Sequence, residues 1–207
     1  MTTDAAFWNK IAAKYARDKI ADMDSYEATL DRVRHHLSAS DRVIELGCGT
    51  GTTALQLADR VADYLATDIS SEMCRIGAEK AQGVTNLSFA VGTAETDHLT
   101  EPGSRDAVLS FNHLHLVPDP AETLRAAAEM LKPGGLLIAK TACLNETWKM
   151  RAMKPVIGLM KVFGKAPGTV SFFDVQTHDQ MIIDAGFDII ETGFYAHPRR
   201  FVVARKL

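Results

Sequence analysis

A glycine-rich turn directly after a short apolar run is the feature that most constrains this fold. Residues 43–46 are apolar apart from Glu45, the turn Gly47-Cys48-Gly49-Thr50-Gly51 follows, and a helical pattern begins at Thr52. Glycine lets the backbone turn sharply and lets a ligand lie against it where a Cβ would intrude. The helix after the turn offers free N–H groups and the positive end of its dipole. This segment predicts a strand, a turn and a helix that hold a nucleotide-like ligand.

Short apolar runs alternate with longer helical patterns along the chain, which is typical of βαβ units and a mostly parallel sheet. Each run is continuous, as expected for strands with both faces covered. Ser70/Ser71 and Pro120 favour helix starts, and 132–135 (Lys-Pro-Gly-Gly) favours a helix end. The expected strands are 43–46, 64–67, 87–91, 107–111 and 136–141, and the expected helices are 52–59, 71–81 and 121–131.

Two segments depart from this alternation. Residues 145–173 are too long for an ordinary connection and carry a helical pattern of their own. Residues 1–40 are helical and amphipathic, so we expect an N-terminal helical cap there and a lid-like insertion over 145–173. The apolar side chains of the first helix recur at helical spacing: Phe7, Trp8, Ile11 and Tyr15.

The end of the chain returns to the earlier pattern. A helix is expected over 177–185, Gly186 ends it, and the runs 188–194 and 200–204 read as a closing strand pair. A chain of 207 residues has room for one domain with a sizeable core. We therefore expect a single domain over residues 1–207.

Composition narrows the class of partner. Hydrophobic residues make up 46% and charged residues 24%, as in an ordinary globular protein, and the net charge of −3 predicts no nucleic-acid partner. Cys48, Cys74 and Cys143 are far apart and form no CxxC pair, which argues against a disulfide framework and a metal site. No apolar run approaches the roughly 20 residues needed to cross a bilayer. These features favour a cytoplasmic location.

The glycine spacing distinguishes between cofactors. A dinucleotide site would need G-x-G-x-x-G, but counting from Gly47 the third glycine falls at Gly51 and residue 52 is Thr. The second expected strand ends at Asp68, where a carboxylate can accept two hydrogen bonds from a ribose diol. An acidic residue there suits adenosine better than a ribose that carries a 2′-phosphate.

Glu45 to Gly51, Asp68 and the segment 131–135 together resemble the signature segments of class I S-adenosylmethionine-dependent methyltransferases. The resemblance runs from about residue 40 to 142. It implies a Rossmann-like, doubly wound sheet of seven strands with the last strand antiparallel. It also implies that Gly47 and Gly49 line the methionine part of the cofactor, that Glu45 holds this region through its carboxylate, and that Asp68 binds the ribose.

Further cofactor contacts follow from the same resemblance. Thr93 stands where the family often has an Asp that reads the adenine amino group, so adenine recognition would rest more on the Ala94 backbone. Met73 resembles an apolar residue that covers the adenine face, and ordinary core filling explains it equally well. The other residues expected beside the cofactor are Cys48, Gly51, Ile69, Glu95, Ser110 and Phe111.

Methyl transfer from a sulfonium is an in-line displacement, so the protein mainly has to align the acceptor and exclude water. Asn112, His113 and His115 follow the fourth expected strand and are the polar groups expected nearest the methyl. Either histidine could serve as a general base, with His115 favoured because it resembles a family histidine, or could only bond to backbone. Tyr15 resembles a family tyrosine that folds over the cofactor, and core packing is the alternative.

The insertion bears on the acceptor. Within 148–165, Arg151, Lys154, Lys161 and Lys165 form one basic helical stripe, and the remainder is a wide apolar face rich in Met. Such a segment could pack as a lid over a greasy acceptor, lie on an anionic membrane surface, or simply cover the sheet edge. Pro155 and Gly158 indicate a hinge or two short helices.

The leading hypothesis is therefore an enzyme that methylates a small or lipophilic molecule, such as a lipid head group or a quinone-like ring. An NAD(P)-dependent oxidoreductase is one alternative, which the glycine spacing disfavours. A non-catalytic, cofactor-binding regulatory protein on the same fold is another. The attacking atom of the acceptor and the oligomeric state do not follow from these residues.

Overall fold

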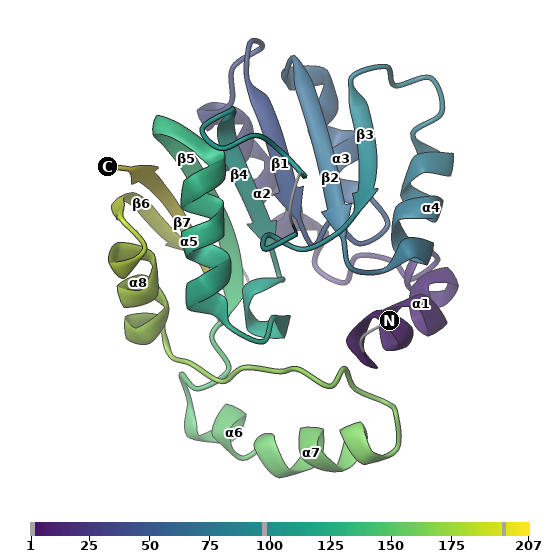
Figure 1. Ribbon diagram of the computed structural model, residues 1–207. Coiled ribbons are helices and arrows are strands. Elements are labelled where there is room, and N and C mark those ends of the chain that lie inside the picture. Colours follow the sequence, from purple (N-terminus) through teal and green to yellow (C-terminus); the bar gives the residue numbers. More distant parts are fainter. Residues whose placement is uncertain (1–2, 97–98, 196–197) are drawn as a thin grey trace.

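The computed structural model describes residues 3–96, 99–195 and 198–207, and this part of the chain forms one seven-stranded sheet (Figure 1). The strands are β1 (Arg42–Leu46), β2 (Asp63–Asp68), β3 (Leu87–Val91), β4 (Arg105–Phe111), β5 (Leu131–Ala142), β6 (Phe187–Phe194) and β7 (Arg199–Lys206). They lie in the order β3-β2-β1-β4-β5-β7-β6. β7 is antiparallel to β5 and β6, and the other neighbours are parallel. The expected Rossmann-like sheet with an antiparallel last strand is confirmed.

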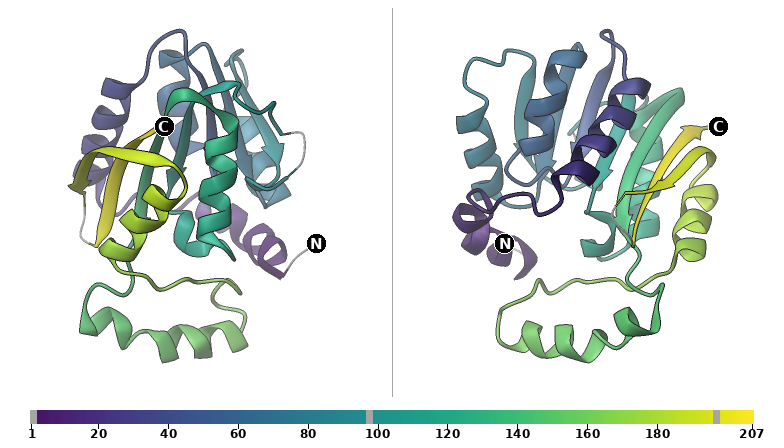
Figure 2. Two further views of the ribbon diagram at one scale, coloured as in Figure 1. Left: turned by 60° about the vertical axis from the view of Figure 1, so that its left-hand side comes forward. Right: turned by 180° about the vertical axis from the view of Figure 1, so that it is seen from behind.

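Helices cover both faces of the sheet (Figure 2). On one face, Leu30 and Leu57 pack with the strands in one apolar core, and on the other face Leu124 and Ile182 do so in a second core. The first face carries α2 (Met23–His36), α3 (Thr52–Leu57) and α4 (Ser71–Lys80), and the second carries α5 (Pro120–Met130) and α8 (Val175–Asp184). The two cores hold the strands rigidly, so the loops at the strand ends have a fixed frame.

Side-chain caps define where several helices begin. Ser70 Oγ accepts a hydrogen bond from the Met73 amide at 3.1 Å, which confirms the expected start of α4. Asp119 caps α5 by accepting from the amides of Ala121 and Glu122, both at 3.0 Å, and Pro120 occupies its first turn. These caps satisfy backbone donors that would otherwise have no partner in the helix.

Three expected boundaries were wrong. The helix over 121–131 ends at Met130, because Leu131 already pairs with Arg105 as the first residue of β5. The register shift between Arg105 and Ala107 lets 132–135 bulge within that strand rather than separate helix from strand. The helix expected over 52–59 ends at Leu57 and continues as the 3-10 turn η1 (Ala58–Arg60).

The first helix of the N-terminal cap and the insertion lie at the carboxyl ends of the parallel strands (Figures 1 and 2). Of the expected cap over residues 1–40, α1 (Thr3–Tyr15) lies at these strand ends, whereas α2 packs on the first face of the sheet. The insertion contains two short helices, α6 (Trp148–Arg151) and α7 (Lys154–Val162), as Pro155 and Gly158 suggested. Throughout the ranges that the structure describes, no helix has the length and apolar character needed to cross a membrane.

Candidate active site

The turn after β1 needs glycine at three positions because the backbone is left-handed there. Gly47, Gly49 and Gly51 have φ values of 70°, 54° and 72°. The Cys48 amide donates to the Thr67 carbonyl at 2.9 Å, which fixes the turn to the end of β2. The turn therefore has one conformation, set by strand pairing on one side and by the start of α3 on the other.

The three glycines face different neighbours. A Cβ on Gly47 would lie 2.4 Å from Cδ2 of His113, and a Cβ on Gly51 would lie 2.5 Å from Cζ of Phe89 in the core. Gly47 and Gly49 line the main cavity, as the resemblance implied. Gly51 and Cys48 do not line it, so the expectation that they touch the cofactor does not fit this geometry. Gly51 is needed for packing against Phe89, and Cys48 is buried.

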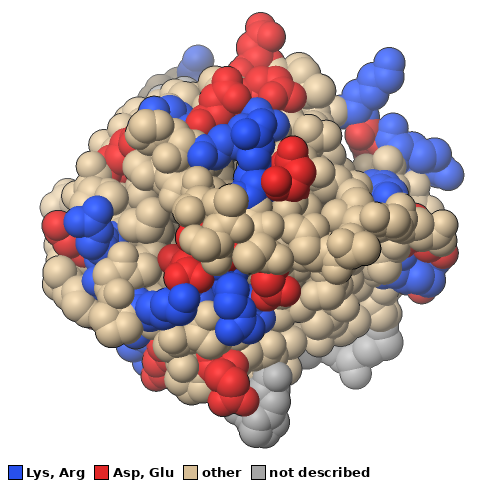
Figure 3. Space-filling view, turned by 90° about the horizontal axis from the view of Figure 1, so that it is seen from above, with Lys and Arg blue, Asp and Glu red and all other residues tan. Residues whose placement is uncertain are grey.

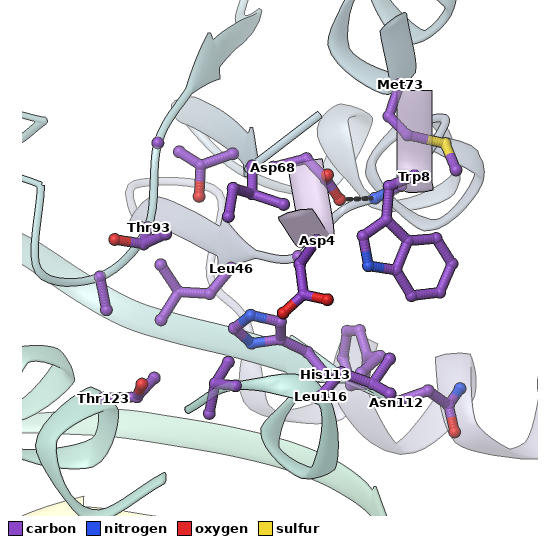
Figure 4. Close-up of a pocket in the computed structure, with 18 of the residues that line it drawn as sticks. Asp4, Trp8, Leu46, Asp68, Met73, Thr93, Asn112, His113, Leu116 and Thr123 are labelled. Atoms are coloured by element: carbon purple, nitrogen blue, oxygen red, sulfur yellow. Dashed lines mark hydrogen bonds between the residues drawn. The ribbon is translucent and has the colours of Figure 1, made fainter. Parts of the chain in front are cut away.

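Asp68 lies at the end of β2 with its carboxylate oriented toward the cavity (Figure 4). One carboxylate oxygen accepts from the Gly49 amide at 2.9 Å and the other from the Ser70 amide at 2.8 Å. Burial raises the pKa of Asp68, although these two amide bonds act in the opposite direction. Each oxygen keeps acceptor capacity on its second lone pair. The carboxylate is thus held in place and can still bind a diol.

Residues from α1 cover the cavity. Asp4, Trp8 and Tyr15 line it, and they share one face of the helix. Tyr15 was predicted at this place, whereas Asp4 and Trp8 were not. The signal that could have found them is their spacing of four and seven residues along the same helix as Tyr15. Figure 4 shows Trp8 and Met73 on one side of the cavity.

The expected adenine end of the cavity is built after β2 and β3. Ile69, Met73, Thr93, Ala94 and Glu95 all line the cavity, as the sequence predicted. Glu95 accepts a hydrogen bond from the Thr123 hydroxyl at 2.6 Å, and Thr123 also lines the cavity. Nothing in the sequence near Thr123 indicates this role, because α5 brings it opposite Glu95 from far along the chain.

The opposite end is formed by the last residue of β4 and the residues that follow it. Phe111 and Asn112 line the cavity, and Asn112 has a left-handed backbone with a φ of 53°. Its amide donates to the Lys140 carbonyl at 2.6 Å, and its Oδ1 accepts from Nε of Arg199 at 3.1 Å. These bonds hold Asn112 at the mouth of the cavity. Asparagine tolerates this backbone region better than most residues with a Cβ.

The two histidines occupy different environments. His113 lines the cavity, and its Nδ1 is 3.3 Å from Oγ of Ser110. His115 lies outside the lining, in the 3-10 turn η2 (Leu114–Leu116), and its carbonyl accepts from the Ser171 amide at 2.7 Å. Burial lowers the pKa of both histidines to about 4. The geometry therefore brings His113, rather than the favoured His115, into the cavity wall.

Two other residues expected at the cofactor lie behind the cavity wall. Glu45 is buried on the face that carries α2 and α3, and its Oε2 accepts from the Tyr64 hydroxyl at 2.8 Å. Burial raises the pKa of Glu45 to about 7, with an opposing effect of the Tyr64 bond and a further rise caused by Asp68. Ser110 is also buried and contacts His113. Neither side chain lines the cavity.

The cavity as a whole has a volume of about 320 Å³ and lies at the carboxyl ends of β1, β2 and β4. Its remaining wall comes from the ends of β1 and β2 and from the loops after β3 and β4, and the sequence did not predict it. These lining residues are Leu46, Thr67, Gly92, Leu116, Val117 and Pro118.

The strand order, the single antiparallel strand and a glycine turn at the carboxyl edge define the class I methyltransferase fold. Comparison with known proteins agrees. Residues 43–135 match the model of the methyltransferase domain family. A ubiquinone biosynthesis O-methyltransferase of Xanthomonas campestris is 35% identical over 107 residues, which are 51% of this chain and 44% of that protein. The chain thus matches less than half of the length of this relative.

Solved structures give the same fold over most of the chain. One is an S-adenosylmethionine-dependent methyltransferase from Thermotoga maritima. The superposition covers 98% of this chain and 99% of that protein, with a TM-score of 0.73 and 22% sequence identity. Another is the [4+2]-cyclase SpnF, for which the superposition covers 86% of this chain and 80% of SpnF, with a TM-score of 0.69 and 18% sequence identity. The chain thus has the fold of the class I S-adenosylmethionine-dependent methyltransferases, and residues 43–135 match the methyltransferase domain family. S-adenosylmethionine is the cofactor of that class.

Proposed function

We propose that this protein transfers a methyl group from S-adenosylmethionine to a small lipophilic acceptor by in-line displacement. The observation that carries the proposal is a single cavity that is lined both by the glycine turn and Asp68 and by the apolar side chains of Leu116 and Val117. Polar groups suited to the donor and an apolar wall suited to the acceptor therefore share one enclosed space.

The residues present fit the donor. Gly47 and Gly49 leave their side of the cavity free of Cβ atoms, so a chain of atoms can lie against the backbone. The carboxylate of Asp68 is fixed by two amides and retains lone pairs for a ribose diol. When bound, S-adenosylmethionine supplies a methyl group on a sulfonium sulfur that leaves as a neutral thioether.

The chain's own residues would exclude water and align the acceptor. Trp8 and Tyr15 cover the cavity from α1, and Leu116 and Val117 line it from the loop after β4. His113 is neutral at pH 7 because burial lowers its pKa to about 4. A neutral imidazole can accept a hydrogen bond from an acceptor hydroxyl or amine and orient its lone pair toward the methyl. Because its pKa is so low, His113 takes up little of the proton of the acceptor before the methyl group is transferred.

The relatives support a lipophilic acceptor. The curated relative from Xanthomonas campestris acts in ubiquinone biosynthesis as an O-methyltransferase, as its name states. A phenolic ring with an apolar tail would fit the apolar wall of the cavity and the neutral imidazole of His113. We therefore place phenols of this kind first among the acceptors to be tested.

The test must measure methyl transfer itself, because a cyclase shares the fold. Purified protein would be incubated with S-adenosylmethionine and a panel of phenols with and without prenyl tails, and S-adenosylhomocysteine would be quantified by chromatography. Calorimetry with S-adenosylmethionine and with NAD would separate the cofactor classes. Asp68→Ala should abolish cofactor binding, whereas Asp188→Asn, an exposed carboxylate on β6, is the matched control.

The outcomes separate the hypotheses. Cofactor binding with S-adenosylhomocysteine formation only in the presence of a tailed phenol supports the proposal. Binding without product over the whole panel would favour a regulatory or cyclase-like protein, and binding of NAD in place of S-adenosylmethionine would favour an oxidoreductase.

A further inference from the structure

The helices of the insertion stand apart from the body of the protein. In all three ribbon views α6 and α7 lie beyond the carboxyl ends of the strands, on the side where α1 covers the cavity (Figures 1 and 2). Neither helix has a buried residue. The apolar face that the sequence predicted therefore does not pack over the sheet edge.

That apolar face is exposed along one side of α7. Val156, Leu159, Met160 and Phe163 recur at i, i+3, i+4 and i+7, which places them on one side of a helix. Their exposed fractions are 48%, 60%, 38% and 67%. Trp148 of α6 is 69% exposed. Large apolar side chains that are grouped and exposed in this way indicate an interaction surface.

All charged side chains within residues 147–173 are positive. Residues 147–173 contain no Asp or Glu. Nζ of Lys154 also lies over the ring of Phe172, 5.1 Å from its centroid. One cation is therefore held beside the extended segment that follows α7. The basic residues of the segment are Lys149, Arg151, Lys154, Lys161 and Lys165.

The ends of the insertion are fixed to the body. Asp4 of α1 accepts hydrogen bonds from the Gly168 amide at 2.5 Å and from the Thr169 amide and hydroxyl at 3.2 and 2.6 Å. The Ser171 amide donates to the His115 carbonyl at 2.7 Å. Residues 168–171 thus connect α7 to the cover of the cavity. Whatever binds α7 is held close to the cavity mouth.

We propose that α6 and α7 dock on the surface of an anionic lipid bilayer. Apolar side chains including Trp and Phe, flanked by lysine and arginine, are the composition of helices that lie in a membrane interface. Five cations, of which Arg151 lies beside the carboxylates of Glu146 and Asp174, complement acidic head groups. Docking needs neither S-adenosylmethionine nor methyl transfer, so its test is independent of the proposed function.

Charge argues against the other occupants. The opposite face of the molecule, viewed from above in Figure 3, carries acidic and basic side chains next to one another. The face of α7 lacks such a mixture. A second copy docked through the same helices would bring five positive charges against five. Like charges across an interface are unfavourable.

The experiment is co-sedimentation of the whole chain with vesicles of phosphatidylcholine plus phosphatidylglycerol, compared with phosphatidylcholine alone. Leu159→Gln and Phe163→Gln together remove exposed apolar groups, and Lys149→Gln and Arg151→Gln together remove two charges. Ile183→Gln in α8, which is 50% exposed, and Arg60→Gln in η1, at the amino edge of the sheet, are the matched controls. Sedimentation equilibrium of each variant reports its oligomeric state.

We expect binding to the anionic vesicles only. The apolar double variant should lower partitioning at least tenfold, and each removed charge about fivefold, while the control variants bind like the wild type. Absence of binding to anionic vesicles would overturn the proposal, as would binding that the α6 and α7 variants leave unchanged. Self-association that is lost in the apolar double variant would overturn it in favour of a second copy.

Discussion

Replacing Glu45 with Gln should stabilise the protein above pH 7 and change it little near pH 5. Glu45 is 2% exposed, and burial raises its pKa from the ordinary value of 4.5 to about 7. The native state therefore holds a proton that the unfolded chain has already released. Stability is highest below pH 4.5, falls as the pH rises, and has lost the whole contribution above the native pKa.

The magnitude follows from the pKa difference. One pKa unit corresponds to about 1.4 kcal/mol, so a rise from 4.5 to about 7 costs on the order of 3 kcal/mol at pH 8 and less than about 1 kcal/mol at pH 5. Glutamine cannot ionise and keeps an oxygen that accepts from Tyr64. The stability of Glu45→Gln relative to the wild type should thus rise by about 2 kcal/mol between these two pH values.

The assay is urea unfolding of both proteins from pH 5 to pH 8, with the free energy of unfolding compared at each pH. Tyr64→Phe provides a second check, because the Tyr64 hydroxyl bond lowers the pKa of Glu45 and its loss should move the fall in stability to higher pH. A difference between Glu45→Gln and the wild type that does not change with pH would refute the reasoning, since it would mean that Glu45 ionises normally in the native state.

Three further predictions concern packing, ion pairing and proton transfer. Gly47→Ala should weaken S-adenosylmethionine binding more than tenfold in calorimetry, because its Cβ would lie 2.4 Å from His113; Gly83→Ala, with a φ of 91° and no atom within 4 Å, is the control and should bind normally. Asp63→Asn should lower the free energy of unfolding by about 1–2 kcal/mol in urea, because Arg105, buried with its Nη1 2.6 Å from Asp63, loses its carboxylate; an unchanged midpoint would contradict this. S-Adenosylhomocysteine formation should show no acidic limb between about pH 6 and pH 8, since the pKa of His113 is about 4, and a limb near 6.5 would show that His113 is not buried during turnover.

Local patterns in the sequence were sufficient for the sheet and for the side of the cavity formed by the glycine turn and Asp68. Continuous apolar runs located the strands, and Ser70 and Pro120 marked two helix starts, because capping depends on neighbouring residues only. Asp68 and Gly47 could be predicted at the cavity because a strand end and its turn are contiguous in sequence. The start of β5 at Leu131 could not, because it depends on pairing with Arg105 in another strand.

The parts of the site that the sequence did not predict depend on contacts between distant segments. The choice between His113 and His115 is decided by η2 and by Ser171, neither of which has a clear local signal. The bond between Glu95 and Thr123 joins residues 28 apart in the chain. Glu45 lies on a strand whose side chains alternate between faces, and that alternation turns it away from the cavity and toward Tyr64.

The hydrogen bonds of Asp4 have a consequence for the order of events in catalysis. Trp8 and Tyr15 line the cavity from the same helix whose Asp4 holds residues 168–169. With the donor bound beneath these side chains, as proposed above, its release requires α1 to move, so α1 must separate from residues 168–171 or carry them with it. We expect the donor to bind before the acceptor and its product to leave last, with the rate of this opening setting the turnover number.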